Sequence, residues 1–388
     1  MTLTYTRRIA ILVSVLALGS CDDDEVSHLR PSIDYSAATA ETPYSELFVD
    51  TNGATTVDLT EGNSRHKMFQ ALNYYSTSSV TAKTHIDAAT LKSMFSNSGN
   101  PFSDISTSTI SVVGAELNAS DVQLKDVVAS SKSASEADAV RAKMESLFDQ
   151  MDAASNSVNA TASNGVAGKL GNYLVDAKGI EIAQIIQKSL IGALELDYIG
   201  NVLLDKGLTD DNHSVVGDNN YTQLEHNWDE AYGLLTLNPI YLAGSTNDAR
   251  GTTEFGAGSY IWEYNKANFA NIYPAFLKGR VAIVNNDVAE YQAQALFIRT
   301  EFEKALAGAA LGYLGKWKSG ADDAARAHAI GEGLGFIYSL RFASVHGGDA
   351  AFSDGILTNL IESPNGFWDL TAEKVNTASD AIKAKFGL

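Results

Sequence analysis

The feature that most constrains the fold is a series of segments in which apolar residues recur every three or four positions. This spacing places apolar side chains along one face of an α-helix. The pattern is strongest at residues 182–194, 221–235, 287–313, 322–342 and 371–386, with shorter examples at 64–75, 87–95 and 136–151. The chain contains only six prolines, and none lies in these segments. The sequence therefore predicts an all-α helical bundle with irregular loops rich in Ser, Asn and Gly.

Some local features refine this prediction. Ser64 and Ser135 precede apolar-periodic segments, so each is a candidate N-cap of a helix. Residues 96–135 are rich in Ser, Asn and Gly, and we predict irregular structure or a short hairpin there.

The first 20 residues have the pattern of a signal peptide. A start that contains Arg7 and Arg8 is followed by an apolar run at 9–18, which is about half the ~20 residues that a membrane-spanning helix needs. The sequence Leu-Gly-Ser-Cys at 18–21 resembles the lipobox of bacterial lipoproteins. That resemblance implies cleavage before Cys21 and lipidation of Cys21. The alternative is an ordinary secretory signal with a chance cysteine.

The segment after Cys21 is polar and lacks periodicity. We predict that residues 21–45 form the lipidated cysteine and a flexible acidic tether, and that residues 46–388 form the helical domain. The lipid would attach the chain to a membrane. The predicted location is the cell envelope, anchored to the outer membrane, with the periplasmic face and the cell surface both open.

The charge of the chain is strongly acidic. Lys and Arg number 28 against 47 Asp and Glu, for a net charge of −19, and removal of residues 1–20 makes it −21 because Arg7 and Arg8 leave with them. An acidic surface repels nucleic acid, so no nucleic-acid partner is expected. A single cysteine also excludes an internal disulfide.

Two predicted helices each carry a histidine one turn before a glutamate. The pairs are His226 with Glu230 and His328 with Glu332. Residues four apart on a helix share a face, which lets an imidazole and a carboxylate approach one ion. Nitrogen and oxygen donors without sulfur suit divalent transition metals such as Fe or Zn. We therefore predict these four residues as metal ligands.

Four further polar residues are expected to support such ligands. They are Asp229, Arg280, Arg299 and Glu303, of which the arginines are candidate partners for the carboxylates. Residues 225–230 contain three acids and no Lys or Arg, so a cation is expected nearby. A buried His/Glu/Arg network that only fixes helix packing explains the same pattern, and this alternative stays open.

Familiar catalytic templates are absent from the sequence. There is no HExxH zinc motif, no Gly-x-Ser-x-Gly elbow and no phosphate-binding Gly loop. A non-catalytic binding protein is therefore expected, although an enzyme is not excluded.

Several segments together resemble a known family. Residues 188–194, 226–233, 298–307, 327–332 and 385–388 resemble a family of bacterial lipoproteins with an imelysin-like domain, DUF4856. The resemblance spans residues 53–388 and implies an all-helical fold of two fused bundle halves. Imelysins carry a Gly-x-His-x-x-Glu motif, which residues 224–229 resemble around His226, with leucine in place of glycine and Asp229 in place of glutamate. Imelysin relatives are associated with iron uptake and, in one case, with peptidase activity.

These observations lead to three functional hypotheses. The first is an envelope lipoprotein whose helical domain binds a metal ion or a metal chelate between its halves. The second is a structural or interaction protein whose polar cluster is only a packing network, and the third is a metallopeptidase-like enzyme. The sequence does not indicate a particular protein partner.

Overall fold

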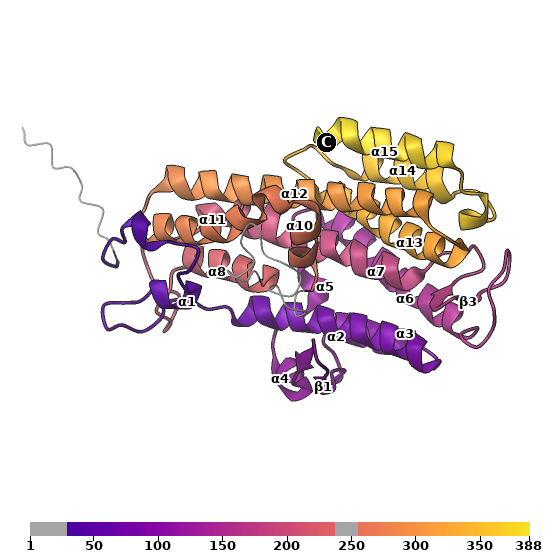
Figure 1. The fold of residues 1–388 in the computed structure, drawn as a ribbon. Helices are drawn as coiled ribbons and strands as arrows, with labels where there is room; N and C mark the ends of the chain where they lie inside the picture. Colours follow the sequence, from indigo (N-terminus) through magenta and orange to yellow (C-terminus); the bar gives the residue numbers. More distant parts are fainter. Residues whose placement is uncertain (1–28, 237–254) are drawn as a thin grey trace, which may run out of the picture.

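The structure is a computed structural model that describes residues 29–236 and 255–388. It confirms the all-α prediction, since the described residues form a helical bundle with two small strand pairs (Figure 1). The predicted signal peptide, Cys21 and the first part of the predicted tether lie outside the described residues. No helix in the described part is long and apolar enough to cross a membrane.

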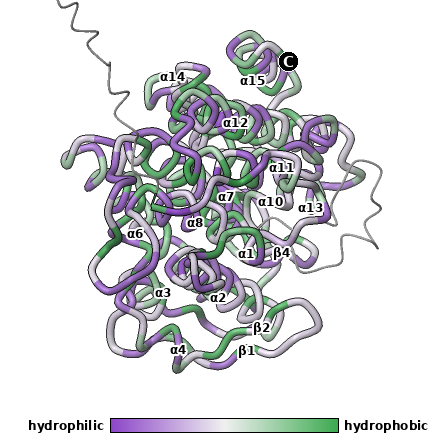
Figure 2. Tube along the Cα trace, turned by 90° about the vertical axis from the view of Figure 1, so that its left-hand side faces the viewer, coloured by the Kyte–Doolittle hydropathy of each residue, from purple (hydrophilic) through white to green (hydrophobic). Residues whose placement is uncertain are grey.

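The bundle is organised around its longest helix, α12 (Val288–Ser319), which packs against α11 (Lys266–Val284), α13 (Asp323–Ser339), α10 (Ala257–Tyr264) and α15 (Ala372–Phe386). Helix α7 (Ile182–Leu190) packs on α13, and α8 (Gln223–Leu235) packs on α11 and on α2 (Thr60–Ala82). Helices α2 and α3 (Ala88–Phe95) lie on one side of the bundle, opposite α14 (Ala350–Ile361) and α15 (Figures 1 and 2).

The remaining elements are short, apart from α6 (Ala134–Ser155) and a π-helix, η2 (Ile191–Leu203). The short helices are α1 (Tyr44–Leu47), α4 (Gly114–Ala119), α5 (Leu124–Val127), and the 3₁₀ turns η1 (Tyr35–Ala37), η3 (Lys206–Thr209), η4 (Leu340–Phe342) and η5 (Gly366–Asp369). Strands β1 (Ile105–Ser106) and β2 (Ser111–Val112) form an antiparallel pair, as do β3 (Gly168–Leu170) and β4 (Tyr173–Val175). The first pair is the short hairpin that was one of two predictions for residues 96–135.

The π-helix continues α7 directly, beyond the end of the predicted segment at residue 194. Its wider turns bring two acidic side chains, Glu195 and Asp197, into the fully buried interior. It also carries Tyr198 toward α8, where the phenol takes part in the site described below. π-helices are rare and occur mostly as single turns within α-helices, so a stretch of 13 residues is unusual.

The packing of α8 on α11 depends on a glycine. The indole of Trp228 is fully buried and donates a hydrogen bond to the carbonyl of Phe276 at 2.9 Å. A Cβ at Gly279 would lie 2.0 Å from the Trp228 ring, so only glycine allows this close approach. The two helices are thereby held close enough for α11 to place a charged residue against α8.

Two cap predictions and several helices differ from the sequence analysis. Helix α2 begins at Thr60, so Ser64 lies within the helix, and Ser133 rather than Ser135 caps α6 in a capping box with Glu136. Helices α10, α11 and α14 were not predicted, nor were the short helices α1, α4 and α5. Pro274 lies inside α11, where it removes a backbone donor and breaks the sequence pattern of a helix.

The prediction of a flexible tether is wrong for residues 30–45. Arg30 reaches into the domain and donates to Glu225 at 2.7 Å, and the Ile33 amide donates to Asn285 Oδ1 at 2.8 Å. The ring of Tyr44 is buried and stacks on Tyr232 with a centroid distance of 4.1 Å. This segment is therefore an ordered part of the domain, because its few large side chains have specific partners.

Candidate metal centre

The pair His226 and Glu230 lies on the face of α8 that meets α2. Glu61, in the first turn of α2, completes a group of three whose donor atoms all lie within 4.8 Å of one another. In the described part of the chain this is the one such group of three or more His, Cys, Asp or Glu residues. The sequence analysis identified two of its three members and missed Glu61.

A glycine makes the contact between these helices possible. A Cβ at Gly62 would lie 2.5 Å from the carbonyl oxygen of Glu230 and 2.6 Å from the amide nitrogen of Leu234. Because both are backbone atoms, α2 can approach α8 this closely only with glycine at position 62. That approach places the neighbouring Glu61 against His226.

Two side chains hold the carboxylates in place. Nη1 of Arg65 donates to Glu61 at 3.1 Å and also contacts Glu230, and the Tyr198 hydroxyl donates to the second oxygen of Glu230 at 3.0 Å. Such donors fix the orientation of carboxylates around metal sites, and they are equally what a packing network would contain.

The electrostatic environment of Glu230 favours the neutral form. Burial raises its pKa to about 7, and the negative charge of Glu61 adds to the rise, although Arg65 opposes it. Burial likewise raises the pKa of Asp126 nearby. Among the described ion pairs, the three carboxyl groups of Asp58, Glu61 and Glu230 have one arginine, Arg65, so carboxyl groups outnumber fixed cations here.

The histidine of the group has a free donor atom. Nδ1 of His226 is buried and has no hydrogen-bond partner, and its nearest carboxylate oxygen, from Asp58, is 4.0 Å away. The imidazole stacks on Tyr221 with a centroid distance of 4.9 Å, which fixes the plane of the ring. One imidazole together with two carboxylates is a donor set that fits Zn²⁺ or Fe²⁺.

His328 and Glu332 form a different arrangement on α13. Nδ1 of His328 lies 2.7 Å from Glu181, and its Nε2 lies 3.6 Å from Glu332, which in turn pairs with Lys188 at 3.2 Å. The ring also stacks on Tyr173 at 4.1 Å. The hydrogen bond to Glu181 contributes to a raised pKa of His328, even though burial acts in the opposite direction.

Charge distinguishes this second cluster from the first. Two carboxylates face one lysine and one histidine whose pKa is raised, so the group is close to neutral without any further cation. Gly335 and Ser339 allow α13 to approach α7 and η2 closely, since they contact Lys188 and Gly192. The predicted ligands His328 and Glu332 are thus part of a paired network between helices.

The two clusters are not parts of one site. Glu61 lies at the start of α2, whereas Glu181 lines a cavity with Thr77 and Thr81 near its end. Sixteen to twenty residues of helix separate Glu61 from Thr77 and Thr81, or about 24–30 Å at 1.5 Å per residue. A single centre that combines His226 with His328 is therefore contradicted by the fold.

Asp229 and Arg280 belong to a third, fully buried network. Arg280 donates to Asp229 at 2.9 Å and to Glu225 at 2.8 Å, and the Tyr44 hydroxyl donates to Asp229 at 2.8 Å. Burial raises the pKa of Asp229 to about 6 in spite of Arg280. Asp229 points about 100° away from Glu230 around α8. It pairs with Arg280 and Tyr44, whereas Glu230 pairs with Arg65 and Tyr198, so Asp229 and Arg280 do not support the candidate ligands as predicted.

Arg299 and Glu303 also lie elsewhere. Arg299 pairs with Asp205 at 2.5 Å, and Glu303 accepts hydrogen bonds from the amides of Val345 and His346 at 2.8 and 2.9 Å. Their predicted role beside the metal ligands is wrong. Both lie on α12, which packs against α13, α11 and η2.

A family model matches most of the chain. Residues 44–388 match the model described as "Domain of unknown function (DUF4856)". The chain belongs to the DUF4856 family. Comparison with curated proteins and with solved structures gives no match.

In this member of the DUF4856 family, the residues that sequence analysis missed share one property. Glu61, Arg65, Glu181 and Lys188 each come from a helix other than the one that carries the histidine they surround. Only the spacing of Glu61 and Arg65, four residues apart, gave a signal, since it predicts an ion pair on one helix face. Nothing in the sequence joined either residue to α8.

Proposed function

We propose that this protein is a non-catalytic binding module that holds one divalent transition metal ion at Glu61, His226 and Glu230. The observation that carries the proposal is the convergence of one donor atom from each of these three side chains within 4.8 Å. The buried Nδ1 of His226, which has no hydrogen-bond partner, supports it. The excess of carboxylates over cations in this cluster supports it, because a bound cation would balance the charge.

We propose that this module lies in the cell envelope and that lipidated Cys21 anchors it there. Its ligand is the metal ion or a chelate of that ion. The lipobox-like residues 18–21 support the anchor. The imelysin-like motif around His226 supports a relation to iron uptake.

The test is calorimetric titration of the purified protein with Fe²⁺ and Zn²⁺. We expect one site per chain, which His226→Ala and Glu61→Gln remove. The matched control is His328→Ala, which alters a histidine in the paired cluster and should leave the affinity unchanged. Because Glu230 must lose its proton to bind an ion, the affinity should rise as the pH increases through about 7.

A second candidate, a packing network without a ligand, is favoured by one observation. Arg65 already contacts both Glu61 and Glu230. Under this alternative, His226→Ala would change only the free energy of unfolding, and neither wild type nor variant would bind metal.

A further inference from the structure

A small cavity opens between α2, the β3–β4 hairpin and the start of α7, at the opposite end of α2 from the candidate metal centre. Its volume is about 230 Å³. Each of the three elements contributes polar side chains to the lining, and these are Thr77, Thr81, Asn172, Glu181 and Gln184. The cavity thus has the polar groups of a small-molecule site, and their charges and hydrogen bonds indicate which ligand fits.

The charges around this cavity favour a neutral ligand. Among the described residues that line it, the charged one is Glu181, which is buried and pairs with His328 at 2.7 Å. A cation lies close by, since Nζ of Lys169 donates to the Asn172 carbonyl at 2.5 Å. Burial and the nearby charge of Lys83 lower the pKa of Lys169, so this ammonium is already disfavoured. An anionic ligand would meet Glu181 and a cationic ligand would meet Lys169.

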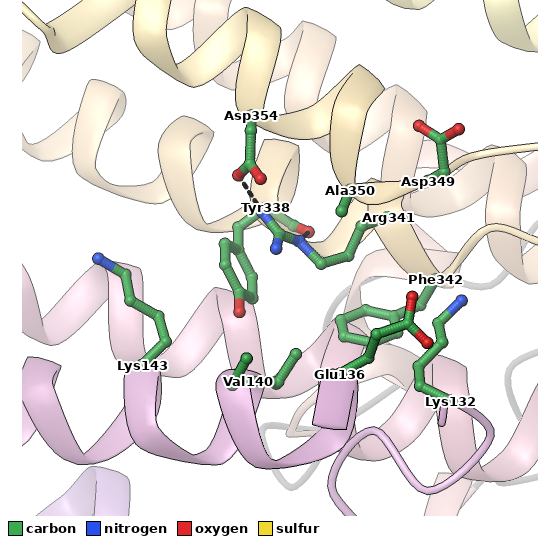
Figure 3. Close-up of a pocket in the computed structure, with 11 residues that line it drawn as sticks. Lys132, Glu136, Val140, Lys143, Tyr338, Arg341, Phe342, Asp349, Ala350 and Asp354 are labelled. Atoms are coloured by element: carbon green, nitrogen blue, oxygen red, sulfur yellow. Dashed lines mark hydrogen bonds and ion pairs between the residues drawn. The ribbon is translucent and has the colours of Figure 1, made fainter. Parts of the chain in front are cut away.

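A larger cavity elsewhere in the bundle lacks this selectivity. The cavity of about 520 Å³ between α6 and α14 has as many acidic as basic side chains in its lining (Figure 3). Arg341 pairs there with Asp354 at 2.5 Å, and Lys132 lies over the Phe342 ring. Because these charges balance one another, they do not distinguish one class of ligand from another.

The small cavity contains a hydrogen-bond acceptor that has no donor. Oε1 of Gln184 is buried and has no hydrogen-bond partner among the described residues, while the same side chain hydrogen-bonds Glu181. The hydroxyls of Thr77 and Thr81 donate to carbonyls of their own helix, those of Asn73 and Thr77, each at 3.0 Å. Their oxygens therefore keep only acceptor capacity for a ligand. The polar groups on the α2 and α7 sides thus call for a ligand with several donors.

The hairpin side of the cavity adds a donor and an apolar wall. The side chain of Asn172 is exposed, and its amide can both donate and accept. Beside it lie the ring of Tyr173 and the side chain of Leu174, which face Val80 of α2 across the lining. The Tyr173 ring is held in place because it stacks on His328 with a centroid distance of 4.1 Å. A ligand that fits must therefore combine hydroxyl groups with an apolar face.

We propose that this cavity binds one neutral monosaccharide ring, either as a free sugar or as the terminal unit of a glycan. A pyranose ring carries hydroxyls that donate and accept at its edge, and C–H groups on its faces. Its hydroxyls would donate to Gln184 Oε1 and accept from Asn172, and one face would pack on Tyr173. The volume of about 230 Å³ lies below the about 300–1,000 Å³ typical of drug-sized ligands, so the cavity holds one ring and leaves further sugar units outside.

The test is saturation-transfer NMR on the intact protein with glucose, galactose and mannose, each as the free sugar and as its methyl glycoside. We expect transfer to at least one of these hexoses and none to tetrahydropyran, which has the same ring without hydroxyls. Transfer to both forms of a hexose supports a glycan end as the ligand, and transfer to the free form alone supports a free sugar. No transfer to any hexose, or equal transfer to tetrahydropyran, would overturn the proposal.

Three variants locate the binding. Thr81 lines the cavity and its neighbour Ala82 does not, and both are exposed. Thr81→Trp should fill the cavity and abolish transfer, while Ala82→Trp should behave like wild type. Gln184→Met, which keeps the length of the side chain but removes the acceptor, should weaken binding by about tenfold. Equal binding by the two tryptophan variants, or equal binding by Gln184→Met and wild type, would overturn the proposal.

Discussion

At the residue scale, the proton on Glu230 links the candidate site to stability. Its pKa in the folded protein is about 7 against 4.5 for an ordinary glutamate, mainly because of burial. A raised pKa means that the folded state binds the proton more tightly than the unfolded state. The resulting stabilisation is complete below the unfolded pKa of 4.5 and is lost as the pH rises through about 7.

This linkage gives a first prediction for the metal-free protein. Between about pH 5 and about pH 8, wild type should lose roughly 2 kcal/mol of unfolding free energy relative to Glu230→Gln, which cannot ionise. Urea unfolding at both pH values, with a chelator present, measures the difference. If the difference in unfolding free energy between wild type and Glu230→Gln were the same at both pH values, Glu230 would be ionised at both.

The buried Arg280 supports a second prediction at this scale. Its removal leaves Glu225 and Asp229 without their shared cation in the interior. We expect Arg280→Ala to lower the free energy of unfolding by about 3–5 kcal/mol. Lys92→Ala, which breaks an exposed pair with Asp149, should cost less than about 1 kcal/mol. Similar losses of unfolding free energy in both variants would contradict a larger contribution of the buried network to stability.

At the scale of elements, the contact between α2 and α8 builds the candidate site. Gly62→Ala would place a methyl group against two backbone atoms of α8 and push the helices apart. We expect a loss of about 1–3 kcal/mol in unfolding free energy and a weaker metal affinity, because Glu61 moves away from His226. Gly315→Ala is the control, since a Cβ at that glycine has nothing within 4 Å. If Gly62→Ala bound metal with unchanged affinity, the site would not depend on the close contact between α2 and α8.

Helices were predictable where one apolar face is continuous. The spacing at 371–386 and 287–313 corresponds to α15 and α12. Helix α11 was missed because Pro274 interrupts it and because it is buried around much of its circumference, which hides the helical period. The π-helix was also not predicted; it packs on α8, α13 and α12, which lie far from it in the sequence.

The candidate site was predictable only in part for a related reason. The HxxxE spacing identified His226 and Glu230 because both lie on one helix. The choice between a metal site and a paired network depends on residues from other helices, such as Glu61 at the first cluster and Lys188 at the second. Both motifs look alike in sequence, and only the fold separates them.

At the scale of the whole molecule, residues 30–45 pack onto the helical domain. Arg30 inserts between α8 and the segment that carries Asn220, and Tyr44 covers Asp229. We expect Arg30→Ala to release residues 30–37, and the Ile33 amide to exchange its hydrogen much faster as a result. Amides within α12 serve as the internal control. Unchanged exchange at Ile33 would show that the segment is held without Arg30.

The central claim is that one of the two HxxxE motifs holds a metal and the other does not. The most direct test is the metal content of the purified protein after loading with Fe²⁺ or Zn²⁺ and removal of the excess. The account predicts one ion per chain in wild type and in His328→Ala with Glu332→Gln, and none in His226→Ala with Glu230→Gln. Metal-free wild type, or loss of the ion in the His328 variant alone, would contradict it.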